Sequence, residues 1–195
     1  MDSKASMPEP SYVSGSVTTA AKILVVGHFA VGKTTFIGSL SEIPPLRTEE
    51  RMTQASAHVD DLAGAPDKVT TTVALDFGRL TLGDEVVLYL FGTPGQQRFV
   101  QLWEDMARGA LGALILVDPV RLADSFPVIE LVEKYGLEYS IAVNSFTDVL
   151  YGEAEIREAL DLLPDTPVSY CDARDRASSA RSLITLVKHL LVRTA

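Results

Sequence analysis

The feature that most constrains the fold of this chain is the motif GHFAVGKT at residues 27–34, which matches G-x-x-x-x-G-K-[ST] throughout. The β-branched apolar run 22–26 precedes the motif and predicts a strand buried on both faces. Residues 33–41 predict a helix. A strand-to-helix corner of this kind binds phosphate because backbone N–H groups and the helix N-terminus both present partial positive charge. The chain is therefore expected to bind nucleotide phosphates.

The residue types in this motif each suit one task. Gly27 and Gly32 allow backbone amides to close around a β-phosphate. Lys33 reaches the β- and γ-phosphate oxygens, and the Thr34 hydroxyl ligates Mg²⁺. The residues of this segment predicted to bind nucleotide are Gly27, Ala30, Val31, Gly32, Lys33, Thr34 and Thr35. The motif alone is equally compatible with a GTPase, an ATPase or a small-molecule kinase.

Short apolar runs and helical patterns alternate along the rest of the chain. Further strands are predicted at 85–91, 111–117, 139–143 and 167–170, and helices at 96–108, 125–135, 153–162 and 178–192. This alternation predicts a parallel sheet with helices on both faces. The exception is 69–82, which passes through Gly83-Asp84 directly into the next strand, as in a tight hairpin. The expected fold is an α/β three-layer sandwich whose six-stranded mixed sheet has one antiparallel strand. The polar stretch 44–68 is expected to be a long loop.

Length and composition fit one domain at 21–195 after a flexible N-terminal tail at 1–20. The net charge of -9 disfavours a nucleic-acid partner, since binding phosphate backbones needs a basic surface. A single cysteine, Cys171, rules out an internal disulfide and favours a reducing compartment. The sequence contains no membrane-spanning apolar run and no lipidation motif. A cytoplasmic location is expected, with any membrane association supplied by protein partners.

The segment FGTPGQQRF at 91–99 resembles the D-T-A-G-Q-E-R-F signature of Ras-like GTPases, and it follows a similar predicted hairpin. Its T-P-G-Q form is closer to bacterial MglA-like GTPases and closest to the GTPases of actinobacterial conservon operons. The resemblance covers about residues 21–192. It implies a P-loop NTPase fold and a small GTPase that binds GTP or GDP with Mg²⁺ and acts as a molecular switch.

The same resemblance implies roles for residues outside the phosphate motif. Gly95 would sense the γ-phosphate and Gln96 would orient the attacking water. Thr72 falls where Ras-like proteins place a threonine that ligates Mg²⁺ and contacts the γ-phosphate. The run of three threonines at 70–72 is equally well explained by strand preference. The residues that would contact the base are Asn144, Asp148 and Ala173, with Asp148 one position late in the run NSFTD.

Three departures from the Ras-like pattern lead to further expectations. Gly92 replaces an aspartate that holds Mg²⁺ through water, and Asp76 lies about 13 Å beyond Thr72 along a strand, which suggests that it is too far away to substitute. Weak Mg²⁺ retention follows from this reasoning. The irregular base motif weakens the preference for GTP over ATP. Phe29 would obstruct an arginine finger from a partner, so slow intrinsic hydrolysis is expected. Candidate arginines within the chain are Arg47, Arg51 and Arg98.

One predicted helix carries an apolar face made of Phe99, Leu102, Trp103 and Met106. This face either packs on the sheet or forms an effector surface. The resemblance implies small dimeric roadblock or longin-type partners and a membrane-associated sensor complex. Two alternatives remain open: a catalytically weak nucleotide-gated scaffold, and an ATP-using P-loop protein such as a small-molecule kinase.

Overall fold

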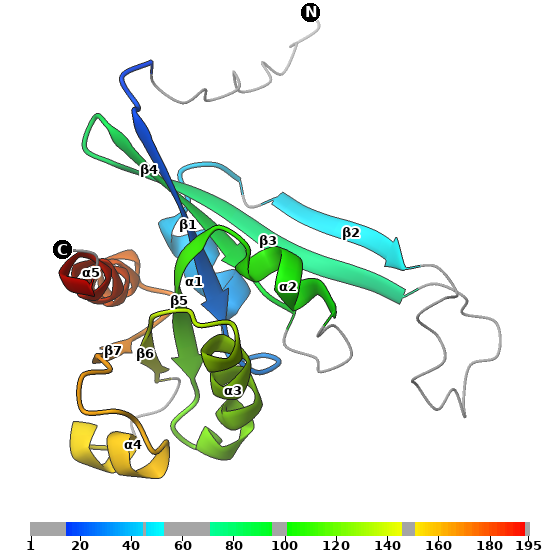
Figure 1. The fold of residues 1–195 in the computed structure, drawn as a ribbon. Helices are drawn as coiled ribbons and strands as arrows, with labels where there is room; N and C mark the ends of the chain where they lie inside the picture. The colour runs from blue at the N-terminus through cyan, green and yellow to red at the C-terminus, as the bar shows by residue number, and fades with distance from the viewer. Residues whose placement is uncertain (1–14, 45, 53–70, 95–100, 146–150, 194–195) are drawn as a thin grey trace, which may run out of the picture.

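The computed structural model describes residues 15–44, 46–52, 71–94, 101–145 and 151–193. The strands are β1 (Thr19–Val26), β2 (Leu46–Met52), β3 (Thr71–Leu82), β4 (Val86–Gly92), β5 (Ala110–Val117), β6 (Tyr139–Asn144) and β7 (Val168–Cys171). The helices are α1 (Lys33–Leu40), α2 (Gln101–Ala107), α3 (Phe126–Lys134), α4 (Glu153–Ala159) and α5 (Arg176–Arg193), with a 3₁₀ turn, η3, at Leu122–Ser125. The strands form one sheet in the order β2-β3-β4-β1-β5-β6-β7 (Figure 1).

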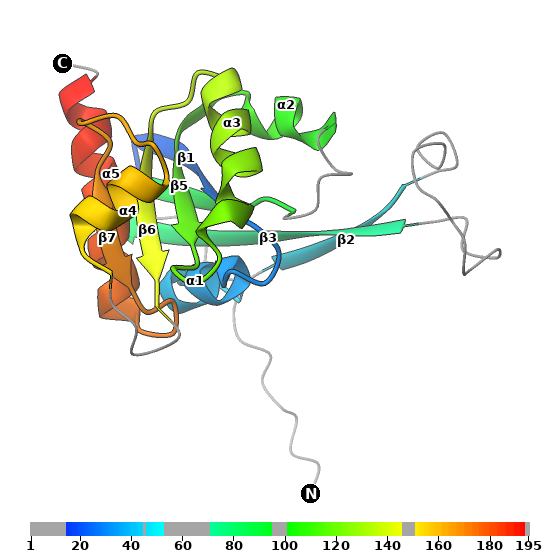
Figure 2. The ribbon, with the colours of Figure 1, turned by 90° about the horizontal axis from the view of Figure 1, so that it is seen from below.

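Helices cover both faces of this sheet and enclose two hydrophobic clusters (Figure 2). The first cluster packs α1 and α5 against residues such as Ile23 and Val25 of β1. The second packs α2, α3 and α4 against Leu24 and Val26 of the same strand. Successive residues of β1 therefore enter opposite clusters, as expected for a strand buried on both faces. The predicted three-layer α/β sandwich is confirmed.

All six predicted strands are present, and β3 runs antiparallel to its neighbours. The hairpin predicted at Gly83-Asp84 joins β3 to β4, and Gly83 has the positive φ of 60° that a tight turn favours. The structure adds a seventh strand, β2, at the edge of the sheet, within the stretch expected to be a loop. Its sequence LRTEERM has no alternation of apolar and polar residues, so the hydrophobic pattern does not predict a strand here.

Two smaller expectations can be compared with the structure. β1 begins at Thr19, inside the segment predicted to be a tail, and Ser16 Oγ donates a hydrogen bond of 2.7 Å to the carbonyl of Asp84. Trp103 and Met106 of α2 are buried in the second cluster, so the structure supports packing for these two side chains. Phe99 and the side chain of Leu102 lie outside what the structure describes. None of the helices in the described segments has the length and hydropathy that a bilayer-spanning helix needs.

Candidate functional site

The loop between β1 and α1 has the backbone conformation of a phosphate cradle. Gly27 and Gly32 have φ values of 147° and 103°, and Ala30 is left-handed at 63°. A Cβ atom on Gly27 would lie 2.5 Å from the carbonyl oxygen of Leu116, so a side chain does not fit there. The two motif glycines are thus required by backbone conformation, and at Gly27 also by space. These observations support the predicted phosphate loop.

Lys33 folds back over this loop from the first turn of α1. Its Nζ atom donates hydrogen bonds to the carbonyls of Gly27, at 2.9 Å, and His28, at 2.8 Å. The side chain is buried, and this burial lowers the pKa of Lys33 from 10.5 to about 8, against an opposing effect of Asp76. The ammonium group is therefore protonated at neutral pH but poorly solvated. Such a cation favours an anionic ligand at the mouth of the loop.

Thr34 follows on the same helix and is exposed. Its hydroxyl donates a hydrogen bond of 2.5 Å to Asp76 Oδ2. The expectation that Asp76 lies too far away to serve this site is wrong. That expectation used the distance from Thr72 along β3. The relevant neighbour lies across the sheet, because Asp76 pairs in register with Gly92 of β4, the position of the missing aspartate.

The Asn144 side chain joins the phosphate loop to the loop after β7. It is fully buried at the end of β6, where Nδ2 donates to the carbonyl of Val31 at 2.8 Å. Its Oδ1 accepts a hydrogen bond of 3.0 Å from the backbone N–H of Ala173. Two predicted base-site residues, Asn144 and Ala173, are therefore hydrogen-bonded to each other. Asn144 also connects them to the phosphate loop through its hydrogen bond to Val31. The resemblance implies that the backbone N–H of Ala173 contacts the base. In this structure that N–H donates to Asn144.

Beside Ala173 lies an ion pair whose role the sequence did not suggest. Arg174 donates from Nε and Nη2 to Asp172 at 2.8 and 2.7 Å, and its backbone N–H donates to Asp172 Oδ1 at 2.9 Å. The hydrogen bonds from Arg174 lower the pKa of Asp172 to about 2. The local signal was an aspartate two residues before an arginine, a spacing that a tight turn can bring into contact. This pair fixes the guanidinium next to the predicted base contact.

The remaining predicted residues are placed less completely. Thr72 of β3 pairs with Arg51 of β2 and lies four residues before Asp76, and its side chain lies outside what the structure describes. Thr35 is exposed on α1, beside Thr34. Gly95, Gln96 and Asp148 lie outside the described residues. The roles assigned to these residues stay predictions.

Phe29 lies at the tip of the phosphate loop, and 67% of its surface is exposed. The neighbouring His28 is buried, with its Nδ1 atom 2.7 Å from the carbonyl oxygen of Phe29. This contact fixes the ring of His28 within the loop. The large exposed ring of Phe29 is compatible with the predicted obstruction of an arginine finger.

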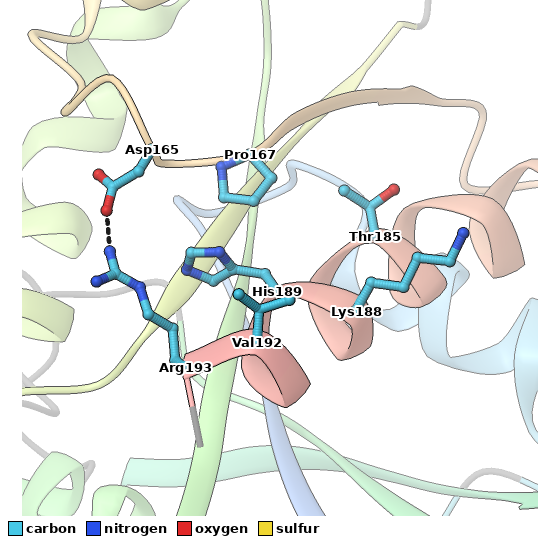
Figure 3. Close-up of a pocket in the computed structure, with 7 residues that line it drawn as sticks. All are labelled: Asp165, Pro167, Thr185, Lys188, His189, Val192 and Arg193. Atoms are coloured by element: carbon cyan, nitrogen blue, oxygen red, sulfur yellow. Dashed lines mark hydrogen bonds and ion pairs between the residues drawn. The ribbon is translucent and has the colours of Figure 1, made fainter. Parts of the chain in front are cut away.

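An open groove lies away from this loop, before the first residue of β7 and along the last turns of α5 (Figure 3). Its lining residues are Asp165, Pro167, Thr185, Lys188, His189, Val192 and Arg193. Arg193 forms an ion pair with Asp165, and His189 Nε2 lies 3.0 Å from Glu138 Oε2. The groove shares no residue with the phosphate loop, and these two basic side chains are already paired with carboxylates.

Comparisons with known proteins agree with this geometry. A family model described as "Conserved hypothetical ATP binding protein" matches residues 25–193. An uncharacterised protein of Methanocaldococcus jannaschii, MJ1339, is 32% identical over 130 residues, which are 66% of this chain and 71% of that protein. Among solved structures, the FeoB G-domain from Methanococcus jannaschii matches with a TM-score of 0.58 at 11% identity, over 88% of this chain and 98% of that one. The fold is thus that of a P-loop NTPase G-domain, and the family description names nucleotide binding.

Proposed function

The chain belongs to the family described as conserved hypothetical ATP-binding proteins, and from this premise we propose that it is a nucleotide-dependent molecular switch. In this proposal it binds GTP or GDP with Mg²⁺ and hydrolyses GTP slowly without a partner. The family description and the fold both support nucleotide binding in general. The choice of GTP and the switching role are the proposed part.

The observation that carries the proposal is the arrangement of Lys33 over the phosphate loop. Its ammonium group is bonded to two carbonyls of the loop itself, those of Gly27 and His28. A bound diphosphate would offer the ammonium charged acceptors, and an ion pair with phosphate is more favourable than a hydrogen bond from the ammonium to a neutral carbonyl. The same anion would receive the backbone N–H groups at the start of α1. The geometry of the loop therefore suits a β-phosphate.

In the proposed switch, the residues that sense the γ-phosphate belong to β3 or follow β4 in the sequence. Gly95 and Gln96 follow β4, and Thr72 lies on β3, the strand that pairs with β4. Contacts from the γ-phosphate to Gly95 and Thr72 would be lost after hydrolysis, which is how GTP-dependent switches change conformation. Gln96 would orient water, and the exposed ring of Phe29 would hinder an arginine supplied by a partner. Slow unaided hydrolysis is expected because Thr71 stands where MglA-like proteins tend to carry an arginine.

ATP is the second candidate ligand. The family description names it, and in this structure the N–H of Ala173 donates to Asn144 rather than standing free for guanine O6. The Ras-like resemblance favours GTP, since the carboxylate of Asp148 in the run NSFTD could accept from guanine N1–H and N2–H while adenine offers neither. We therefore propose GTP as the physiological ligand and treat ATP as the alternative.

The low pKa of Lys33 predicts a pH dependence of nucleotide affinity. As pH rises through about 8, the free protein loses the Lys33 proton and with it the cation that binds phosphate. If the protonated form alone binds, the Kd for GDP at pH 9 should be about tenfold higher than at pH 7. Isothermal titration across this range measures the effect. The control is Lys33→Arg, which stays charged and should lack this component; identical pH profiles for the two proteins would contradict the prediction.

The identity of the ligand is tested by denaturing the purified protein and separating the released nucleotide. GDP is the expected product, whereas ADP would support the ATP-using alternative. Single-turnover measurements with GTP should then show slow conversion to GDP. Rapid unaided turnover would contradict the catalytic proposal, and bound GTP that is never hydrolysed would favour the nucleotide-gated scaffold.

We further propose protein regulators of the roadblock or longin type and a cytoplasmic location, with membrane contact made through such partners. The support is the resemblance of 91–99 to MglA-like and conservon GTPases. Co-purification of the GDP-loaded and GTP-loaded chain with candidate dimers tests this proposal, and binding that ignores the nucleotide state would count against a switch.

A further inference from the structure

We propose that Asp76 carries out the metal-positioning task of the carboxylate that is missing at position 92. The inference rests on the proposed Mg²⁺-nucleotide function. It assigns the metal-positioning task to a residue on β3, whereas position 92 lies on β4. It is drawn from the juxtaposition of Thr34, Asp76 and Gly92 at the end of β4. Asp76 acts on the cation through Thr34 and through water, and is thus a positioning residue.

The contact between Thr34 and Asp76 is the first support. The separation of 2.5 Å between Thr34 Oγ1 and Asp76 Oδ2 is typical of a hydroxyl that donates to an ionised carboxylate. A hydroxyl that donates its proton still has lone pairs for a cation. Asp76 therefore orients the Thr34 oxygen as a ligand. The negative charge of Asp76 also acts on Lys33, where it opposes the lowering of the lysine pKa by burial.

The cross-strand geometry is the second support. Asp76 and Gly92 are register partners on β3 and β4. A Cβ atom on Gly92 would lie 3.0 Å from the Cβ of Asp76 and 3.4 Å from its Oδ2. A side chain at position 92 would thus enter the space that Asp76 now uses. In this chain the carboxylate lies on the facing strand, and the absence of a side chain at position 92 leaves room for it.

The donor set also fits Mg²⁺ as it is normally bound with nucleotides. Mg²⁺ retains several waters and uses one or two carboxylates together with phosphate oxygens. Within the described segments, no group of three or more His, Cys, Asp or Glu residues could hold a cation by itself. Thr34 and Asp76 supply one hydroxyl and one carboxylate, so the cation should bind tightly only with the nucleotide. Strong sensitivity of nucleotide retention to a chelator follows, opposite to the expectation drawn from Gly92 alone.

The test uses the full chain loaded with a fluorescent GDP analogue, whose release is timed at a series of Mg²⁺ concentrations and in EDTA. The first variant is Asp76→Asn, which keeps the size of the side chain and removes its charge. The matched control is Asp84→Asn in the exposed β3–β4 turn. A second variant, Asp76→Gly with Gly92→Asp, places the carboxylate on β4 and removes the Cβ at position 76, although the new Cβ would still lie 3.0 Å from Ile37 Cδ1.

In the parent and in Asp84→Asn, Mg²⁺ should slow release strongly relative to EDTA. Asp76→Asn should require about 10- to 100-fold more Mg²⁺ for the same effect, as is usual when a residue that orients metal ligands is lost. Its release rate in EDTA is compared with the parent separately, so that any effect of the lost charge on Lys33 is distinguished from the effect on Mg²⁺. The exchanged double variant should recover much of the Mg²⁺ response.

An unchanged Mg²⁺ response in Asp76→Asn overturns the inference and leaves the proposed function intact. Failure of the parent itself to bind the analogue overturns the proposed function. If the double variant does not fold, Asp76→Asn still decides the question. Recovery in the double variant excludes a purely structural role for Asp76, because that role would not return with a carboxylate on the other strand.

Discussion

Replacing Lys33 by alanine is expected to weaken GDP binding by roughly 30-fold or more, the largest effect of any single change at this site. Removing one member of a desolvated charge pair costs about 2–5 kcal/mol, and each 1.4 kcal/mol is a factor of ten in Kd. Lys33 meets this condition because its ammonium group is buried over the loop, where it donates to the carbonyls of Gly27 and His28. Isothermal titration with GDP measures the loss.

Lys188→Ala is the matched control, since it removes an exposed lysine of the α5 groove that shares no residue with the phosphate loop. Its GDP affinity should equal that of the parent. Circular dichroism must show that Lys33→Ala is folded, which is expected because the substitution removes a poorly solvated charge. If folded Lys33→Ala held GDP as tightly as the parent, the binding site would lie elsewhere in the molecule.

Asn144→Ala is expected to lower the free energy of unfolding by about 2–6 kcal/mol, because two backbone groups lose their partner and each unsatisfied buried group costs about 1–3 kcal/mol. These groups are the carbonyl of Val31 and the N–H of Ala173. Nucleotide affinity should also fall, since the phosphate loop is no longer fixed to the end of β6. Urea titration gives the stability and titration with GDP gives the affinity.

A neighbouring residue on β6 provides the control for this second change. Ser140 is fully buried, and its hydroxyl has no hydrogen-bond partner within the described part of the chain. Ser140→Ala should therefore alter stability far less than Asn144→Ala and should leave GDP binding unchanged. Equal losses for both variants would mean that Asn144 contributes packing alone, without the bridging role assigned to it.

The buried strands and the phosphate loop could be predicted from sequence because their signals are local. Runs such as 22–26 and 111–117 are apolar throughout, and the motif residues are contiguous. β2 was missed because an edge strand needs no apolar face, and its charged residues look like those of a loop. Local pattern therefore defines the centre of the sheet better than its edge.

The candidate site was predicted where the residues follow one another and missed where they meet across strands. Asn144 was identified, but its bond to Val31 joins residues 113 positions apart and depends on the strand order. Asp76 was rejected on a distance along one strand, although cross-strand register places it opposite Gly92. Register is decided by the whole sheet, so no spacing rule within the motif could supply it.

The facing positions 76 and 92 also limit how this protein can change over evolution. Acquiring an acid at position 92 while Asp76 is present would crowd two side chains whose Cβ atoms lie about 3.0 Å apart, and would set two like charges against each other. Losing Asp76 first would leave neither strand with an acid. With the proposed role for Asp76, either single change would impair Mg²⁺ retention, so positions 76 and 92 are expected to change together among relatives of this chain.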